Sequence, residues 1–118
     1  MPHLTLEYTA NWPELDVNRA LTVFNSVLIE SGHFEGPDIK SRAVRLEHFV
    51  VGDGSAATAF AHVTLRLLQG RSPEAKSVLA RSLLAALQSI ARLDDATAMQ
   101  LSVEICEIER LSYAKYAI

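Results

Sequence analysis

The sequence predicts an α+β fold in which two helices cover one face of a four-stranded sheet. Three observations lead to this prediction. Short segments alternate apolar and polar residues, two longer segments repeat apolar residues at helical spacing, and the elements follow in the order strand, helix, strand, strand, helix, strand. Within each strand–helix–strand unit, the helical crossover favours a parallel pair of strands. The length of 118 residues fits one domain, spanning residues 1–118.

The first strand and the first helix have clear signatures. Leu4, Leu6 and Tyr8 alternate with polar residues, which is typical of a strand with one buried face. Asp16 is a favourable N-cap for the helix that follows, and Gly32 can end that helix in a left-handed conformation. The apolar stripe between them has helical spacing and consists of Val17, Leu21, Phe24 and Leu28.

The two middle strands are separated by a break rich in glycine. Alternating residues predict a strand from Arg42 to Val51, and the Gly-Asp-Gly-Ser segment at residues 52–55 interrupts the pattern. The next strand runs from Phe60 to Leu68. Its two faces are predicted to carry different residues, with Phe60, His62, Thr64 and Arg66 on one face and Ala61, Val63, Leu65 and Leu67 on the other.

The second helix begins at a well-defined cap. Ser72 is the N-cap, and Pro73 occupies the first helical position, where proline is favoured. The buried stripe of this helix is predicted to be Leu79, Leu83, Ala86 and Ile90. We expect Asp94 and Asp95 in the loop beyond it, followed by a fourth strand from Leu101 to Ile108.

The last residues, 111–118, are unusually apolar for a chain end and contain Tyr113, Tyr116 and Ile118. A sheet covered by helices on one face only leaves the other face in need of a partner. Both features favour a homo-oligomer in which the tail docks on a neighbouring subunit, although a ferredoxin-like monomer has the same order of elements.

The composition argues against several classes of function. The chain is 49% hydrophobic and has a net charge of −3 with both signs interspersed, so neither nucleic acid nor an anionic membrane surface is indicated. No segment approaches the ~18 apolar residues of a membrane span, and no signal-peptide pattern is visible. Cys106 is the only cysteine, which excludes an internal disulfide and fits a reducing, cytoplasmic location. The alternating pattern around it predicts a buried structural thiol.

Pro2 carries the most specific chemistry in the chain. If the initiator methionine is removed, Pro2 becomes the N-terminus and carries a free secondary amine. An α-amino group titrates at about 7.7–8.0. Burial or a nearby cation lowers that pKa and leaves a neutral base at physiological pH. The alternative is that Pro2 only marks the start of an edge strand.

Four segments, taken in order, resemble the 5-carboxymethyl-2-hydroxymuconate isomerase family of the tautomerase superfamily. They are Met-Pro-His-Leu at 1–4, Ile-Lys-Ser-Arg at 39–42, Phe-Ala-His-Val-Thr-Leu at 60–65 and Gly-Arg-Ser-Pro-Glu at 70–74. The resemblance implies the βαββαβ tautomerase (MIF-like) fold. It also implies a homotrimer whose three sheets enclose a central barrel.

The resemblance implies a keto–enol or double-bond isomerase of homoprotocatechuate degradation, a branch of aromatic catabolism. Pro2 would move a proton between oxygen and carbon of an unsaturated 2-hydroxy polycarboxylate such as 5-carboxymethyl-2-hydroxymuconate. Arg42, Arg71 and Lys40 would bind its carboxylates. Arg71 precedes a helix N-terminus, where free N–H groups favour anions, and Arg42 could grip a carboxylate with two hydrogen bonds. Lys40 stands where the family usually has arginine, so it keeps the charge but loses the planar fork.

Neither a metal nor a redox cofactor is predicted, because the four histidines lack the close spacing of metal ligands. The expected partners are an anionic small-molecule substrate and further copies of the chain. His62 is interpreted as a core or interface histidine and not as a proton relay. Two alternatives remain open: a hydratase or dehalogenase of unsaturated acids on the same fold, to which Lys40 would point, and a non-catalytic trimeric binding module.

Overall fold

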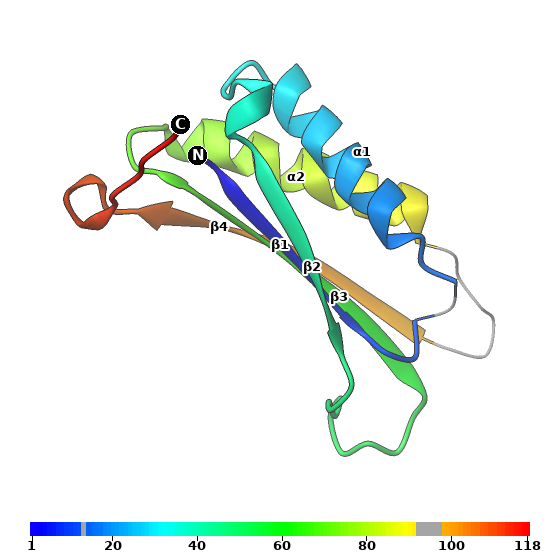
Figure 1. Ribbon diagram of the computed structural model, residues 1–118. Helices are drawn as coiled ribbons and strands as arrows, with labels where there is room; N and C mark the ends of the chain where they lie inside the picture. Colours follow the sequence, from blue (N-terminus) through cyan, green and yellow to red (C-terminus); the bar gives the residue numbers. More distant parts are fainter. Residues whose placement is uncertain (13, 92–97) are drawn as a thin grey trace.

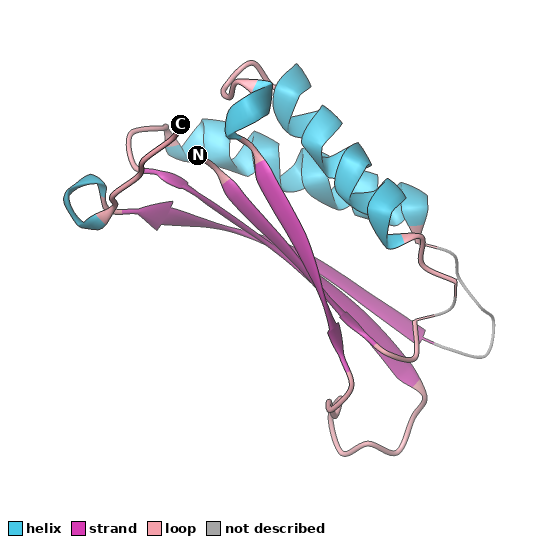
Figure 2. Ribbon diagram, viewed as in Figure 1, coloured by secondary structure: helices cyan, strands magenta, loops and turns pink. Residues whose placement is uncertain are grey.

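The computed structural model describes residues 1–12, 14–91 and 98–118. Its elements are β1 (His3–Thr9), α1 (Val17–Glu30), β2 (Lys40–Leu46), β3 (Thr58–Leu68), α2 (Pro73–Ile90) and β4 (Ala98–Ile108). Two short 3-10 helices, η1 (Gly36–Asp38) and η2 (Arg110–Ser112), precede β2 and follow β4 (Figure 2). The four strands form one layer and the two long helices lie together across one face of it, as predicted (Figure 1).

The strand order in the sheet is β2-β1-β3-β4. Each helical crossover joins a parallel pair, β1 with β2 and β3 with β4, and the central pair β1–β3 is antiparallel. The parallel pairs predicted from the crossovers are therefore confirmed. In this register His3 pairs with Lys40 on one side and with Arg66 on the other. The start of β1 thus lies beside the start of β2 and the end of β3.

Both long helices begin and end as their sequences predict. The Asp16 carboxylate accepts the backbone N–H of Arg19 at 3.1 Å, and the Ser72 hydroxyl accepts that of Ala75 at 3.1 Å. Each cap satisfies one of the N–H groups that the first helical turn leaves without a partner. Gly32 follows α1 with φ +78°, a conformation that glycine adopts without strain. Neither long helix combines the length and the hydrophobicity needed to cross a membrane.

The core lies between the helices and one face of the sheet. On the helices it is formed by Ala20, Phe24, Leu28, Leu79, Leu83, Ala86 and Leu87. On the two central strands it is formed by Leu4, Leu6, Ala59, Ala61, Val63, Leu65 and Leu67, all fully buried. Burying one such leucine stabilises the fold by about 1.5–3 kcal/mol. Helix α1 contributes Ala20 in place of the expected Leu21, which is only half-buried.

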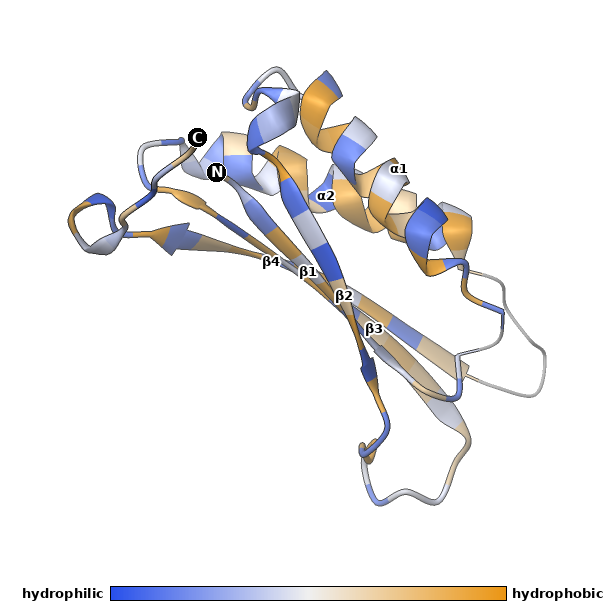
Figure 3. Cartoon of the chain, viewed as in Figure 1, coloured by the Kyte–Doolittle hydropathy of each residue, from blue (hydrophilic) through white to orange (hydrophobic). Residues whose placement is uncertain are grey.

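The opposite face of the sheet, which we call the open face, is polar. Strand alternation places His3, Thr5, Glu7, Lys40, Arg42, His62, Thr64, Arg66, Ser102, Glu104 and Cys106 on it. These side chains are half-buried or exposed, whereas their neighbours along the central strands are buried. The same alternation is visible as bands of contrasting hydropathy along the strands (Figure 3).

Three predicted strands have different bounds in the structure. The strand expected from Phe60 to Leu68 runs from Thr58 to Leu68. The strand expected from Arg42 to Val51 runs from Lys40 to Leu46, because its partner β1 ends at Thr9, opposite Leu46. The last strand begins at Ala98 and not at Leu101, because it pairs with a β3 that already begins at Thr58.

Two further predictions concern single residues. Cys106 is half-buried on the open face, and its thiol lies 3.7 Å from a carboxylate oxygen of Glu104, so the prediction of a buried thiol is wrong. Its strand neighbour Ile105, whose side chain points to the other face, packs against the core. Asp94 and Asp95 lie outside the described residues.

Candidate active site

Pro2 is buried at the point where β1 begins. Its carbonyl oxygen accepts the backbone N–H of Lys40 at 3.1 Å, which extends the β1–β2 pairing by one residue. The amine of Met1, directly before it, donates to the carbonyl oxygen of Asp38 at 3.2 Å. With Met1 attached, the Pro2 nitrogen is an amide without a basic lone pair, and removal of Met1 converts it to a secondary amine at the same place.

Lys40 brings a positive charge to this chain end. Its Nζ donates to the carbonyl oxygen of Asp38 at 2.6 Å, the oxygen that the Met1 amine also contacts. The pKa of the N-terminal amine is lowered, first by burial and then by the charges of Lys40 and Lys115, while the charge of Asp38 opposes them. Lowering this pKa increases the fraction of neutral amine at pH 7. Lys40 and the chain start are therefore brought together, as the resemblance implies.

Arg42 lies two residues further along β2, on the open face. Its Nη2 contacts Nδ1 of His3 at 2.5 Å, so the two side chains meet diagonally across the β1–β2 pair. The Nε2 atom of the same ring lies 3.2 Å from the hydroxyl of Tyr113. His3 thus joins the predicted arginine to the C-terminal tail.

Arg71 is positioned differently from the other two cations. Its terminal nitrogens donate to the carbonyl oxygens of Leu68 at 3.2 Å and His33 at 3.0 Å, and its guanidinium lies 4.8 Å from the ring centre of Phe34. The Nε atom is buried and has no hydrogen-bond partner within the described residues. Arg71 therefore fastens the end of β3 to the segment after α1. Arg71 lies at the Pro2 end of the sheet, because its partner Leu68 is two residues past Arg66, which pairs with His3.

The C-terminal tail contributes contacts that sequence reasoning did not assign to the site. Besides Tyr113 on His3, the Nζ of Lys115 lies 3.2 Å from Oδ1 of Asp38. The apolar character of residues 111–118 signalled that the tail docks on something, but not that these two side chains dock on their own chain. Figure 1 shows the two chain ends close together. Leu111, Tyr116 and Ile118 remain exposed.

His62 is on the open face and not in the core. Its Nδ1 lies 2.7 Å from the Ser102 hydroxyl and its Nε2 lies 2.8 Å from a carboxylate oxygen of Glu104. No group of three or more His, Cys, Asp or Glu side chains suited to a metal ion occurs within residues 1–12, 14–91 and 98–118.

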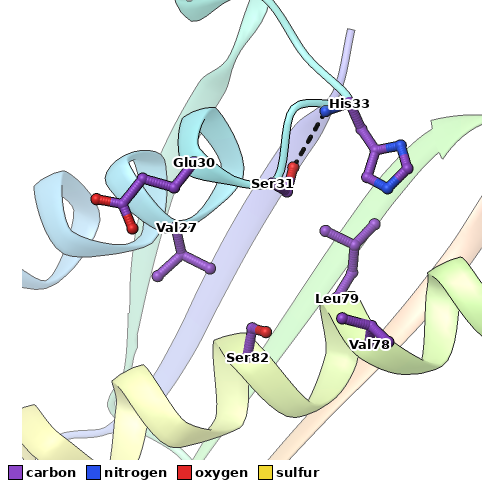
Figure 4. A pocket seen from close by; sticks show the side chains of 7 residues that line it. All are labelled: Val27, Glu30, Ser31, His33, Val78, Leu79 and Ser82. Carbon is purple, nitrogen blue, oxygen red and sulfur yellow. Dashed lines mark hydrogen bonds between the residues drawn. The ribbon is translucent and has the colours of Figure 1, made fainter.

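A hollow of about 290 Å³ lies between the two helices (Figure 4). Its lining residues are Val27, Glu30, Ser31, His33, Val78, Leu79 and Ser82. Neither Pro2 nor any of the three predicted cations lines it. The chemistry at the chain start, and not the presence of this hollow, therefore identifies the candidate site.

Comparisons with known proteins identify the family of the chain. The family model described as 5-carboxymethyl-2-hydroxymuconate isomerase matches residues 2–118. A solved 5-carboxymethyl-2-hydroxymuconate isomerase from Deinococcus radiodurans R1 is 34% identical, with a TM-score of 0.86 over 98% of this chain and 88% of that one. No curated protein gives a match.

More distant structures share the fold. A solved 5-carboxymethyl-2-hydroxymuconate delta-isomerase is 22% identical, with a TM-score of 0.87 over 99% of this chain and 89% of that one. A fused 4-OT described as a symmetric trimer is 16% identical, with a TM-score of 0.72 over 97% of this chain and 93% of that one. The match over residues 2–118 shows that the chain belongs to the 5-carboxymethyl-2-hydroxymuconate isomerase family, a family of isomerases within the tautomerase superfamily.

Proposed function

We propose that this protein is a cofactor-free tautomerase that uses Pro2 as its base on an unsaturated 2-hydroxy polycarboxylate such as 5-carboxymethyl-2-hydroxymuconate. The observation that supports this most directly is the position of Pro2, which is buried and hydrogen-bonded to Lys40 at the start of β1. Removal of Met1 leaves a secondary amine whose position is fixed by the β1–β2 pairing. A base held in this way loses little orientational freedom when the substrate binds.

The electrostatics of the chain start favour a neutral amine. Burial and the charges of Lys40 and Lys115 already lower the pKa of the Met1 amine. Pro2 is itself buried, and burial disfavours the charged form of an amine at that position too. A base whose pKa lies near the working pH is the most effective in proton transfer.

The proposed reaction consists of two proton transfers. The lone pair of the Pro2 nitrogen takes the proton of the 2-hydroxyl group, so that an O–H bond breaks, an N–H bond forms and the substrate becomes a dienolate. The prolinium then returns a proton to a carbon atom of the conjugated system as the carbon–oxygen bond becomes a carbonyl. The product is the conjugated keto isomer, and Pro2 is again neutral.

The cations have distinct roles in this proposal. Lys40 neutralises a substrate carboxylate beside the amine, and Arg42 binds a second carboxylate from the open face. Arg71 retains a second N–H on each terminal nitrogen for a further carboxylate, while the backbone carbonyls hold its guanidinium in place. Fixed cations also stabilise the negative charge of the dienolate.

We extend the proposal to a homotrimer in the cytoplasm. The helices cover only one face of the sheet, and large apolar side chains at Leu111, Tyr116 and Ile118 are exposed. Contact with further copies would remove these side chains from water. The free thiol of Cys106 is compatible with a reducing compartment.

The test is to compare the chain beginning at Pro2 with the same chain carrying Met1. Intact-mass measurement establishes which species is present, and a spectrophotometric assay follows the dienol of 5-carboxymethyl-2-hydroxymuconate. We expect the species with Met1 to lose about 10²–10⁴-fold in kcat, the usual contribution of a general base.

Pro2→Ala, with Met1 removed, is the matched variant because it keeps an amine but makes it primary and mobile. We expect an intermediate kcat. Equal kcat in the species with and without Met1 would contradict the role of Pro2. Turnover of halogenated acrylates in place of the dienol would instead support the dehalogenase alternative.

A further inference from the structure

The C-terminal tail reaches back to the candidate active site. After β4, η2 turns the chain, and Tyr113 and Lys115 then contact the start of β1 and η1. The rings of Tyr113 and His3 also pack edge to face, with centroids 6.2 Å apart and an interplanar angle of 62°. Tyr113 is half-buried, whereas Tyr116, three residues later, is 86% exposed. Only the first of these two tyrosines is part of the packed structure.

The hydrogen bonds of His3 define which of its nitrogens carries the proton. A guanidinium group has donors and no acceptor. Nδ1 of His3 must therefore accept from Arg42, which requires that Nδ1 has no hydrogen. In the neutral ring the hydrogen is then on Nε2, which faces the hydroxyl oxygen of Tyr113. Arg42 thus selects this tautomer, and the Tyr113 hydroxyl, which can donate or accept, accepts from Nε2–H.

We propose that Tyr113 is a positioning residue, which accepts from Nε2–H of His3 and holds the ring in place so that its Nδ1 orients Arg42 for the substrate. The inference rests on the proposed function, because it assumes that Arg42 binds a carboxylate. It assigns the C-terminal tail to the support of the active site. Arg42 is exposed on β2, which is an edge strand of the sheet. Without a hydrogen-bond acceptor its long side chain would therefore occupy many rotamers. Loss of that freedom before the substrate arrives improves substrate binding.

The charges around His3 agree with a neutral ring. The groups that face it come from the chain start, from both neighbouring strands, from η1 and from the tail: the Met1 amine, Lys40, Arg42, Arg66, Asp38, Tyr113 and Lys115. Among these groups Lys40, Arg42, Arg66 and Lys115 are cations, and Asp38 is the one anion. Burial and then Arg42 are the main causes that lower the pKa of His3 below its ordinary value. Protonation would place a second donor opposite Arg42 and release it.

The first experiment needs no turnover. Long-range ¹H–¹⁵N correlation spectra distinguish the two tautomers of a neutral histidine, and His3→Gln identifies the signals of His3 by their loss. We expect the Nε2–H tautomer in the native protein. The Nδ1–H tautomer would overturn the inference, even if Pro2 proves to be the base.

The second experiment compares Tyr113→Phe with Tyr116→Phe, which removes the same hydroxyl from the exposed part of the tail. For Tyr113→Phe we expect KM to rise about 2- to 10-fold, the range that corresponds to one lost neutral hydrogen bond, with kcat unchanged. Tyr116→Phe should match the native protein. A purely structural role would lower the apparent kcat through loss of folded protein, which thermal unfolding detects, and would leave KM unchanged. Equal KM values in the two variants would therefore overturn the inference.

His3→Gln separates tautomer from charge. The Gln side chain can accept from Arg42 through its oxygen and donate to Tyr113 through its nitrogen, but it does not titrate. We expect the KM of this variant to rise less than the native KM as the pH falls from 8 to below 6.5. A KM that rises with acid as steeply as in the native protein would contradict the role of His3.

Discussion

Two histidines on the open face have opposite kinds of partner. Nδ1 of His3 faces the guanidinium of Arg42, and Nε2 of His62 faces the carboxylate of Glu104. The remaining nitrogen of each ring faces a hydroxyl group, from Tyr113 and Ser102 respectively.

The difference decides what protonation does to each ring. A serine hydroxyl donates or accepts, and a carboxylate accepts, so a protonated His62 keeps both of its hydrogen bonds. A protonated His3 cannot keep the bond to Arg42, because two donors would then face each other. Protonation therefore leaves both hydrogen bonds of His62 in place but breaks the contact between His3 and Arg42, although both histidines lie on the open face. Of the two histidines, only His3 is next to Pro2.

The largest expected difference in activity is between variants of Arg42, the charged partner of His3, and of Glu104, the charged partner of His62. We expect Arg42→Ala to lower kcat/KM about 10- to 100-fold, the effect of losing one hydrogen bond to a charged group. Glu104→Ala removes an exposed carboxylate from the His62 cluster, and we expect kcat/KM to change by less than about twofold. Steady-state kinetics with the dienol substrate measure both.

Arg45→Ala is the control for loss of an arginine from β2. Arg45 forms an ion pair with Glu47 at 3.3 Å with more than half of each side chain exposed, and it has no contact with His3. If Arg45→Ala or Glu104→Ala were as damaging as Arg42→Ala, the two clusters would not differ in function.

The elements follow from local sequence patterns. The caps at Asp16 and Ser72, the glycine after α1 and the alternation of the strands each involve neighbours within a few residues, so sequence alone reveals them. The end of β2 depends instead on where β1 ends. That boundary is a property of the pair and is not visible in the sequence of β2.

The candidate site was predictable only in part. Pro2 could be found because a proline that becomes the N-terminus has distinctive chemistry, whereas Lys40 could be found only through the resemblance of residues 39–42 to a known family. The contact of Tyr113 with His3 joins residues 110 positions apart, and residues 111–118 have no periodicity that indicates a direction of packing. Arg71 could be recognised as a cation beside a helix start, but its anchoring by two carbonyl oxygens depends on the arrangement of β3 and α1.

An intermediate effect is expected in the pH dependence of stability. Burial and Arg42 lower the pKa of folded His3, so the unfolded chain takes up this proton first as the pH falls. The contribution of His3 to the stability of the fold is therefore complete above the ordinary histidine pKa of about 6.5 and is lost progressively below it.

For Glu104, the hydrogen bond from His62 is the main cause that lowers the pKa. Its contribution is complete above the ordinary glutamate pKa of about 4.3 and is lost below that.

Denaturant unfolding at fixed protein concentration, from pH 8 to pH 3, tests this order. His3→Gln should flatten the curve just below pH 6.5 and leave the steeper acid part unchanged. Glu104→Gln should do the reverse. A loss of the same pH window in both variants would show that the two histidine clusters do not titrate independently.

The smallest expected effect concerns the second contact that holds the C-terminal tail at the site, between Lys115 and Asp38. The tail has no corresponding contact with the His62 cluster among the hydrogen bonds of the described residues. Lys115 and Asp38 form an ion pair at 3.2 Å, with 38% and 45% of their side chains exposed, and this contact is the main cause that lowers the pKa of Asp38. Exposed ion pairs stabilise little and are screened by salt. We therefore expect Lys115→Met to raise KM less than Tyr113→Phe does, and the ratio of variant to native KM should fall towards one between 0.02 and 1 M NaCl. The corresponding ratio for Tyr113→Phe should stay constant, because a hydrogen bond between neutral groups is not screened. If salt abolished both effects, the tail would be held at the site by its charge, and Tyr113 would not be the group that orients His3.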